Sequence, residues 1–333
     1  MPTPGDPALV HSAVTADQAC TRRTLLTLSL AGGVSAVLAT QAWPRGGIRM
    51  LVAYPTGGVS DLVARALARE WSERLKVPVL VENRPGAAGT LALDMLSRNP
   101  PDGHTLVFTA SAAMGILRET LTSRSTSQGV APTVAMPVPV AGVMRTPLLL
   151  VGTSALEGGT LADMVTYARR HPGSLRWATT GEGTTGHRVL QRISRQADLQ
   201  IVHVPYKGGG QQLTDALGGH FEVLSTNVAP TQLTALRKGS FKALAVGAPL
   251  RLPLLPEVPT LAELGYAQAN LDSLFGLFAA HGTPPELVER INQSIEQALR
   301  APAIRARLKD ANNQLFEGSA KEFASQVERE TSR

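Results

Sequence analysis

The stretch IRMLVAYPTGGVSDLVARALAREWSERLKVPVLVEN, residues 48–83, decides the fold because it has the pattern of one strand–helix–strand unit. Its apolar run RMLVAYP ends in a glycine turn, and a second apolar run, VPVLVEN, closes the stretch. Between the two runs, residues 61–75 place Val63, Leu67 and Trp71 on one face and charged residues on another, which predicts an amphipathic helix. Two strands joined by such a helix predict a parallel crossover.

The same alternation continues along the chain and predicts an α/β fold. Short apolar runs are separated by segments with helical periodicity. Several of these runs are almost continuously apolar, which is typical of strands covered by helices on both faces. The further runs are HTLVFTA (104–110), PLLLVG (147–152), LRWATT (175–180), IVHVPY (201–206), FEVLST (221–226) and KALAV (242–246).

Two proline-rich stretches interrupt this alternation and predict crossings between two lobes. Residues 123–147 contain four prolines among apolar residues, so they cannot form one regular helix. Residues 248–260 are also rich in proline and precede another apolar run. We therefore expect one lobe from residues 43–145 plus 273–333 and a second lobe from residues 146–272, joined by a hinge.

Residues 1–42 are expected to be a cleaved export signal. Arg22 and Arg23 directly precede an uncharged segment that is short for a membrane span and rich in Gly, Ser and Thr. The paired arginines are similar to the twin-arginine form of signal, which implies export in a folded state; a general secretory signal is the alternative. Cleavage before Trp43 removes Cys20, the single cysteine, so thiolate chemistry and disulfides are excluded from the mature chain. We expect a periplasmic protein.

The composition favours a globular protein without a nucleic-acid partner. The chain has 333 residues, 43% of them hydrophobic, and a formal net charge of +6. A chain of this length can bury a full core. Its Lys and Arg residues are scattered singly or in pairs, with no stripe suited to a nucleic-acid backbone. We expect a monomer that binds no nucleic acid.

The stretch ATTGEGTTGHRVLQ, residues 178–191, contains a glycine pattern with two interpretations. Gly181, Gly183 and Gly186 spell the G-x-G-x-x-G fingerprint of dinucleotide-binding folds. A NAD(P)-dependent oxidoreductase would need an acidic residue at the tip of the next strand, and the residues there, Pro-Tyr-Lys at 205–207, do not provide one. In the second interpretation, unpaired backbone N–H groups at a helix start bind a small anion.

The anion interpretation gives roles to the side chains of this turn. Thr184 and Thr185 would add hydroxyl donors, and His187 would add a third donor or cap the turn. A second glycine turn, YPTGGVSD at residues 54–61, also joins a strand to a helix. If one turn from each lobe faced a common cleft, the two would grip the carboxylates of one ligand from both sides.

Catalytic and metal-binding motifs are missing from the sequence. It contains no G-x-S-x-G elbow, no H-E-x-x-H zinc motif and no Walker A loop. Acidic residues such as Glu82 and Asp102 are interpreted as solvated surface groups. We therefore expect no catalytic residue, no metal site and no cofactor.

Six motifs together make the chain resemble a known family, the periplasmic solute receptors of tripartite tricarboxylate transporters, also called the Bordetella uptake gene family. The motifs occur in family order from Ile48 to the last expected helix. They are YPTGGVSD (Tyr54–Asp61), VENRPGAAG (Val81–Gly89), PDGHTL (Pro101–Leu106), GEGTTGH (Gly181–His187), VPYKGG (Val204–Gly209) and GLFAAHGTP (Gly276–Pro284).

The resemblance implies a type II periplasmic binding protein, with two α/β lobes that close on a ligand in the cleft between them. It implies that the first glycine turn holds one carboxylate of the ligand through backbone groups and bridging water, and that the second turn meets the ligand from the other lobe. The expected ligand-binding residues are Tyr54, Thr56, Gly57, Gly58, Ser60, Asp61, Thr180, Thr184, Thr185, His187, Thr226 and Asn227.

One departure from the family pattern bears on the ligand. Family members often carry Asp-Asn where this chain has Thr226 and Asn227. Without that carboxylate, an amino acid is less favoured than a di- or tricarboxylate or another organic acid. The expected partners are this small carboxylate and the membrane permease subunits of a transporter; a sensor kinase that reads the ligand-bound form is the alternative.

Overall fold

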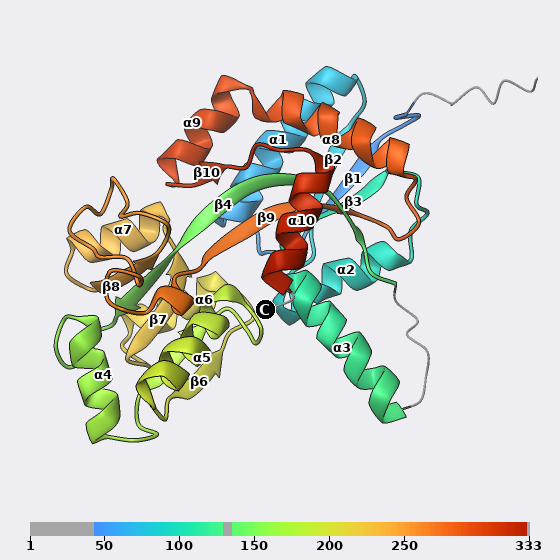
Figure 1. Ribbon diagram of the computed structural model, residues 1–333. Coiled ribbons are helices and arrows are strands. Elements are labelled where there is room, and N and C mark those ends of the chain that lie inside the picture. The colour runs from blue at the N-terminus through green and yellow to red at the C-terminus, as the bar shows by residue number, and fades with distance from the viewer. Residues whose placement is uncertain (1–42, 129–134, 332–333) are drawn as a thin grey trace, which may run out of the picture. The chain divides into compact units, whose positions relative to one another are not determined.

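The computed structural model describes residues 43–128 and 135–331, and it confirms the α/β fold (Figure 1). The strands form one connected sheet with the order β2-β1-β3-β9-β4-β7-β5-β6, and β8 and β10 pair with β4 outside this path. The strands are β1 (Ile48–Val52), β2 (Val79–Asn83), β3 (Thr105–Ala110), β4 (Val138–Gly152), β5 (Arg176–Thr179), β6 (Val202–Pro205), β7 (Val223–Asn227), β8 (Lys242–Gly247), β9 (Asp272–Ala279) and β10 (Gln314–Leu315).

The predicted strand–helix–strand unit is present. β1 lies between β2 and β3 and is parallel to both, with Ile48 opposite Val79 and Arg49 opposite Thr105. The connecting helix begins two residues before the expected start, at Val59. The helices are α1 (Val59–Leu75), α2 (Thr90–Ser97), α3 (Ala112–Gln128), α4 (Leu161–Arg170), α5 (Thr185–Ala197), α6 (Gly209–Leu217), α7 (Pro230–Arg237), α8 (Pro285–Leu299), α9 (Pro302–Asp310) and α10 (Ala320–Thr331), with short 3-10 turns at Ala87–Gly89 and Ala267–Ala269.

The long strand β4 connects the two parts of the sheet. Residues 138–147 pair with β9, whereas residues 148–152 pair with β7 and β8. The sequence predicted a crossing over residues 123–147; in the structure α3 still continues to Gln128, and the crossing is a strand that extends to Gly152. Figure 1 shows β9 alongside β4 on the return path.

Hydrophobic clusters cover both faces of each part of the sheet. Beside β1, β3 and β9, one cluster contains side chains of α1, α8 and α9, and another contains side chains of α2, α3 and α10. Beside β5, β7 and β8, one cluster contains side chains of α4 and α5, and the other contains side chains of α6 and α7. These helices hold the turns at the strand ends in place.

None of the helices in the described residues is both long enough and apolar enough to cross a bilayer. The predicted export signal, residues 1–42, lies outside the described part of the chain.

A substitution at Gly276 of β9 tests how closely α10 packs on the crossing strands. A Cβ at this position would lie 2.2 Å from Cζ of Phe323 on α10 and 2.5 Å from the carbonyl oxygen of Ala141. We expect Gly276→Ala to lower the free energy of unfolding by about 1–3 kcal/mol, because the added methyl group overpacks a closed interface. The measurement is urea unfolding of the mature protein, with Gly159→Ala as the control, since a Cβ there meets nothing within 4 Å. Equal midpoints for the two variants would contradict this packing.

Candidate functional site

The first glycine turn is held from inside by a buried carboxylate. Asp61 is 1% exposed, and its carboxylate accepts the Gly57 N–H at 2.9 Å and the Asn83 side-chain amide at 2.7 Å. Nε of Arg65 donates to it at 3.0 Å. Burial opposes the charge, but these three donors outweigh it and hold the pKa of Asp61 below its usual range. Asp61 therefore fixes the turn and has no exposed oxygen to offer a ligand.

The remaining residues of this turn leave the start of α1 accessible. Thr56, Gly57 and Gly58 are exposed, and Gly57 has a φ of +85°, a conformation that favours glycine. Gly58 is the N-cap of α1 and brings no side chain to cap it. Ser60 lies in the first helical turn and is buried. The positive end of α1 thus faces outward beside exposed backbone.

Tyr54 lies behind the turn. Its hydroxyl accepts the backbone N–H of Ala110 at 3.0 Å, and its ring packs on Phe275 of β9 with the ring centroids 5.5 Å apart. Burial raises the pKa of the Tyr54 hydroxyl, so this group stays protonated at neutral pH. Tyr54 links the first turn to the end of β3 and to the middle of β9.

Each of the three glycines in the second turn occupies a position where the local geometry favours glycine. Gly181 and Gly183 have φ values of +128° and +70°, which favour glycine. Gly186 has ordinary torsions, but a Cβ on it would lie 2.7 Å from Cβ of Ser225 on β7. Two glycines shape the turn, and the third lets the first turn of α5 pack closely on a strand.

The two threonines of this turn differ in whether the hydroxyl hydrogen is already used in a hydrogen bond within the protein. Oγ1 of Thr184 donates its only hydrogen to the Gly181 carbonyl at 2.7 Å. Oγ1 of Thr185 instead accepts a hydrogen bond from Ser273 of β9 at 2.9 Å, so its own hydrogen can be donated elsewhere. The sequence predicted both hydroxyls as donors to a ligand; in the structure the Thr184 hydrogen is already used within its own turn, whereas the Thr185 hydrogen is not. Thr184 is also the N-cap of α5, and its side chain does not cap the helix.

Two histidines support the second turn from behind. Nδ1 of His187 accepts the Gly183 N–H at 2.9 Å. Its ring stacks on that of His203 from β6, with the centroids 4.1 Å apart and the planes 6° apart. Nε2 of His203 is 2.7 Å from Oγ1 of Thr179. His187 therefore caps the turn, one of the two roles that the sequence left open.

The other predicted residues lie at the ends of neighbouring strands. Thr180 follows β5 and is half-buried. Thr226 and Asn227 end β7; Thr226 is 8% exposed and accepts a hydrogen bond from Gln232 at 3.1 Å, whereas Asn227 is half-buried. Parallel β5 and β7 are neighbours, so their ends reach the same edge of the sheet.

Each glycine turn lies close to a loop of the opposite lobe. A Cβ placed on Gly208, after β6, would lie 3.1 Å from Cγ of Pro55 in the first turn. A Cβ on Gly181 would lie 3.4 Å from Cβ of Ala88, in the short helix after β2. The turns that follow β1 and β2 therefore approach the turns that follow β6 and β5.

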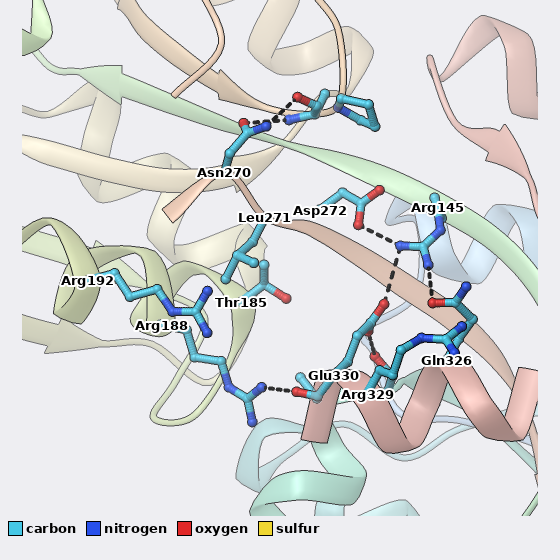
Figure 2. Close-up of a pocket in the computed structure, with 14 residues that line it drawn as sticks. Arg145, Thr185, Arg188, Arg192, Asn270, Leu271, Asp272, Gln326, Arg329 and Glu330 are labelled. Atoms are coloured by element: carbon cyan, nitrogen blue, oxygen red, sulfur yellow. Dashed lines mark hydrogen bonds and ion pairs between the residues drawn. The ribbon is translucent and has the colours of Figure 1, made fainter. Parts of the chain in front are cut away.

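A pocket of about 420 Å³ lies next to the crossing strands and the start of α5 (Figure 2). It shares Thr185 with the predicted ligand set. Its other polar side chains were not among the residues predicted from the sequence, although Thr185, Arg188 and Arg192 have the i, i+3, i+7 spacing of one helix face. The charged residues lining it are Arg145, Arg188, Arg192, Asp272, Arg329 and Glu330.

An ion-pair network joins the two lobes at this pocket. Figure 2 shows Arg145 of β4 between Asp272 of β9 and Glu330 of α10. Nη1 of Arg145 is 2.7 Å from Oδ1 of Asp272 and 3.2 Å from Oε1 of Glu330. Burial raises the pKa of both carboxyl groups, although Arg145 opposes the shift in each case. Arg188 of α5 donates to the backbone carbonyl of Glu330 at 2.6 Å. The last turn of α10 thus contacts a crossing strand and a helix of the second lobe.

Metal ligands do not gather in the described part of the chain: no group of three or more His, Cys, Asp or Glu side chains could hold an ion there. The two glycine turns instead offer backbone amides and the Thr185 hydroxyl at helix starts. Such groups bind anions.

Comparison with known proteins gives the same assignment as the motifs. The family described as tripartite tricarboxylate transporter family receptor matches residues 63–333. Protein BugT of Bordetella pertussis is 31% identical over 277 residues, which cover 82% of this chain and 82% of BugT.

Solved structures match over most of the chain. MatC of Rhodopseudomonas palustris, solved with bound malate, has a TM-score of 0.75 and 28% identity and covers 87% of this chain and 98% of its own. A second protein of R. palustris, solved with adipate, has a TM-score of 0.75 and 28% identity and covers 88% and 96%. A periplasmic transporter and the periplasmic binding protein BugD are among the other matches, which confirms the type II periplasmic binding protein fold with two lobes. The chain belongs to the tripartite tricarboxylate transporter receptors, a family of solute-binding proteins.

Proposed function

We propose that this protein is a periplasmic receptor that captures a small di- or tricarboxylate and passes it to the membrane permease of a tripartite transporter, without transforming it. One observation carries the proposal: two glycine turns, each at the start of a helix without a side-chain cap, both lie within contact distance of a loop of the other lobe. The malate and adipate bound by the two R. palustris proteins support the ligand class.

Charge makes the two turns suitable for an anion. Each turn presents the positive end of a helix dipole, equivalent to roughly half an elementary charge. In the first turn, the nearby carboxylate of Asp61 is compensated by Arg65. In the second turn, Thr185 adds a hydroxyl hydrogen. A carboxylate of the ligand would therefore receive backbone amides from one lobe and an amide–hydroxyl pair from the other.

Closure would convert binding into a signal for the permease. A ligand that contacts both turns is bound most tightly when the lobes are together, so it shifts the population toward the closed form. Arg188 of α5 bonds to Glu330 of α10, so we expect this contact between the lobes to contribute to the closed form. The permease would recognise the closed surface, and the export signal at residues 1–42 would bring the receptor to the periplasm.

The ligand class is tested by titration calorimetry of the mature protein. We expect malate, succinate, adipate or citrate to bind, and glutamate and aspartate to bind more weakly, because Thr226 offers no carboxylate to an ammonium group. NAD and NADP in a thermal-shift assay serve as the control for the dinucleotide alternative. Tight binding of glutamate or aspartate alone, or a nucleotide-dependent shift, would contradict the proposal.

The role of Thr185 is tested by Thr185→Val, which removes the hydroxyl and keeps the shape. We expect the free energy of ligand binding to weaken by about 1.5–3 kcal/mol, because a hydrogen bond to a charged group is lost. Ser273→Ala is the matched control: it removes the donor to Thr185 and leaves the Thr185 hydroxyl in place. If Thr185→Val bound the ligand as the wild type does and Thr184→Val bound it more weakly, Thr184 and not Thr185 would be the donor to the ligand.

The contribution of α10 to closure is tested by Arg188→Ala. We expect a loss of about 1 kcal/mol, or roughly fivefold in Kd, because the removed bond joins the two lobes. Arg195→Ala, an exposed arginine of the same helix, is the control and should leave Kd unchanged. If Arg188→Ala bound the ligand as the wild type does, the bond to Glu330 would have no part in closure.

A further inference from the structure

The hydrogen bond between Gly183 and His187 determines which nitrogen of the imidazole carries a proton. A backbone N–H can only donate, so Nδ1 of His187, 2.9 Å from the Gly183 nitrogen, must present a lone pair. The neutral ring therefore has its proton on Nε2. A proton on Nδ1 would face the Gly183 N–H, and the bond would be replaced by a repulsive contact of two donors.

The second imidazole belongs to the same network. His203 stacks on His187 almost in parallel and reaches Thr179 through Nε2. Oγ1 of Thr179 accepts the Gly181 N–H at 3.2 Å and lies 3.1 Å from the Gly181 carbonyl oxygen. The stretch from Gly181 to Gly183 is therefore held at one end by Thr179 and His203, and at the other by His187.

The charges around His187 favour its neutral form. Burial lowers the pKa of His187, and the carboxylate of Glu182 in the turn opposes this shift only in part. Burial also lowers the pKa of His203, and a charge on His187 lowers it further. Glu182 of the turn and His203 of β6 are the titratable groups that act on the ring. Both rings are thus neutral at neutral pH.

We propose that His187 is a positioning residue for the carboxylate ligand: its neutral imidazole holds the Gly183 amide and so maintains the anion-binding turn, and protonation of the ring releases the turn and weakens binding. The proposal rests on the function proposed above and adds its dependence on pH. Protonation of His187 is therefore expected to lower the affinity. Simple electrostatic attraction would have the opposite effect, because a histidine cation beside a carboxylate would strengthen binding.

The direction of the pH effect follows from linkage. The ligand-competent turn requires the neutral ring, so affinity is constant above the pKa of His187 and is lost as the pH falls through that pKa. Below it, the affinity approaches a loss of about tenfold per pH unit, because one proton is taken up when the ligand leaves. The folded-state pKa is lowered, so this loss occurs on the acidic side of the ordinary histidine range.

The test compares wild type, His187→Asn and His187→Ala by calorimetry between pH 7.5 and 5.0, with malate and adipate as probes. Oδ1 of asparagine can take the place of Nδ1 as acceptor but does not titrate. We expect His187→Asn to bind within about threefold of wild type at pH 7.5 and to lack the extra acidic loss, whereas His187→Ala binds more weakly at every pH. Protonation of the ligand itself is common to all three proteins and cancels in their ratios.

His220→Asn, at an exposed histidine of the second lobe, is the control and should keep the wild-type pH profile. A wild-type affinity that rises toward pH 5.0, or a His187→Asn profile that still follows the wild type, would overturn the proposal.

A second measurement does not depend on the ligand. In nitrogen-15 NMR of the wild-type protein, His187 should show the Nε2–H form, and the Gly183 amide should shift as His187 titrates. An Nδ1–H form would overturn the proposal even if carboxylates bind. If neither malate, adipate, succinate nor citrate binds the wild type at pH 7.5, the proposed function fails, and the NMR result alone then decides whether His187 holds the turn.

Discussion

The pairing of β4 with strands of both lobes is the constraint on which the rest of the structure depends. Its first ten residues pair with β9 and its last five with β7 and β8, so one continuous backbone positions both parts of the sheet. Arg145 lies on this strand and ties it to β9 and α10. The distance between the glycine turns is therefore set by strand pairing and by packing far from the turns themselves.

The glycine turns are stabilised by side chains that point inward, and this is why their helix starts remain available. Asp61 and Thr184 use their oxygen atoms on backbone groups of their own turns. In contrast, α4 begins with a full capping box, in which Thr160 and Asp163 satisfy the first amides of that helix. A capped helix start has fewer amides for a ligand, so the proposed site depends as much on which donors are left unused as on which are present.

The G-x-G-x-x-G pattern is explained by the same physical needs that produce it in dinucleotide-binding folds. Gly181 and Gly183 allow a turn with positive φ, and Gly186 allows a helix to approach a strand closely. These needs belong to any anion-binding strand-to-helix turn, so the letters alone do not identify a nucleotide. The residues around the turn carry the information about its ligand. Here they are the stacked rings of His187 and His203 and the Thr185 hydroxyl, which is bonded to Ser273 of β9.

The sequence by itself determined the α/β elements, the two glycine turns and the family, because apolar periodicity and turn residues act over a few neighbouring positions. It placed α1 within two residues and the turn at Gly181 correctly between β5 and α5. Only the tertiary structure decided which groups can meet a ligand. Ser273 and Thr185 are 88 residues apart, and Arg145 and Glu330 are 185 apart. Whether a hydroxyl, a carboxylate or an imidazole is already engaged depends on such distant partners, and a local pattern contains no information about them.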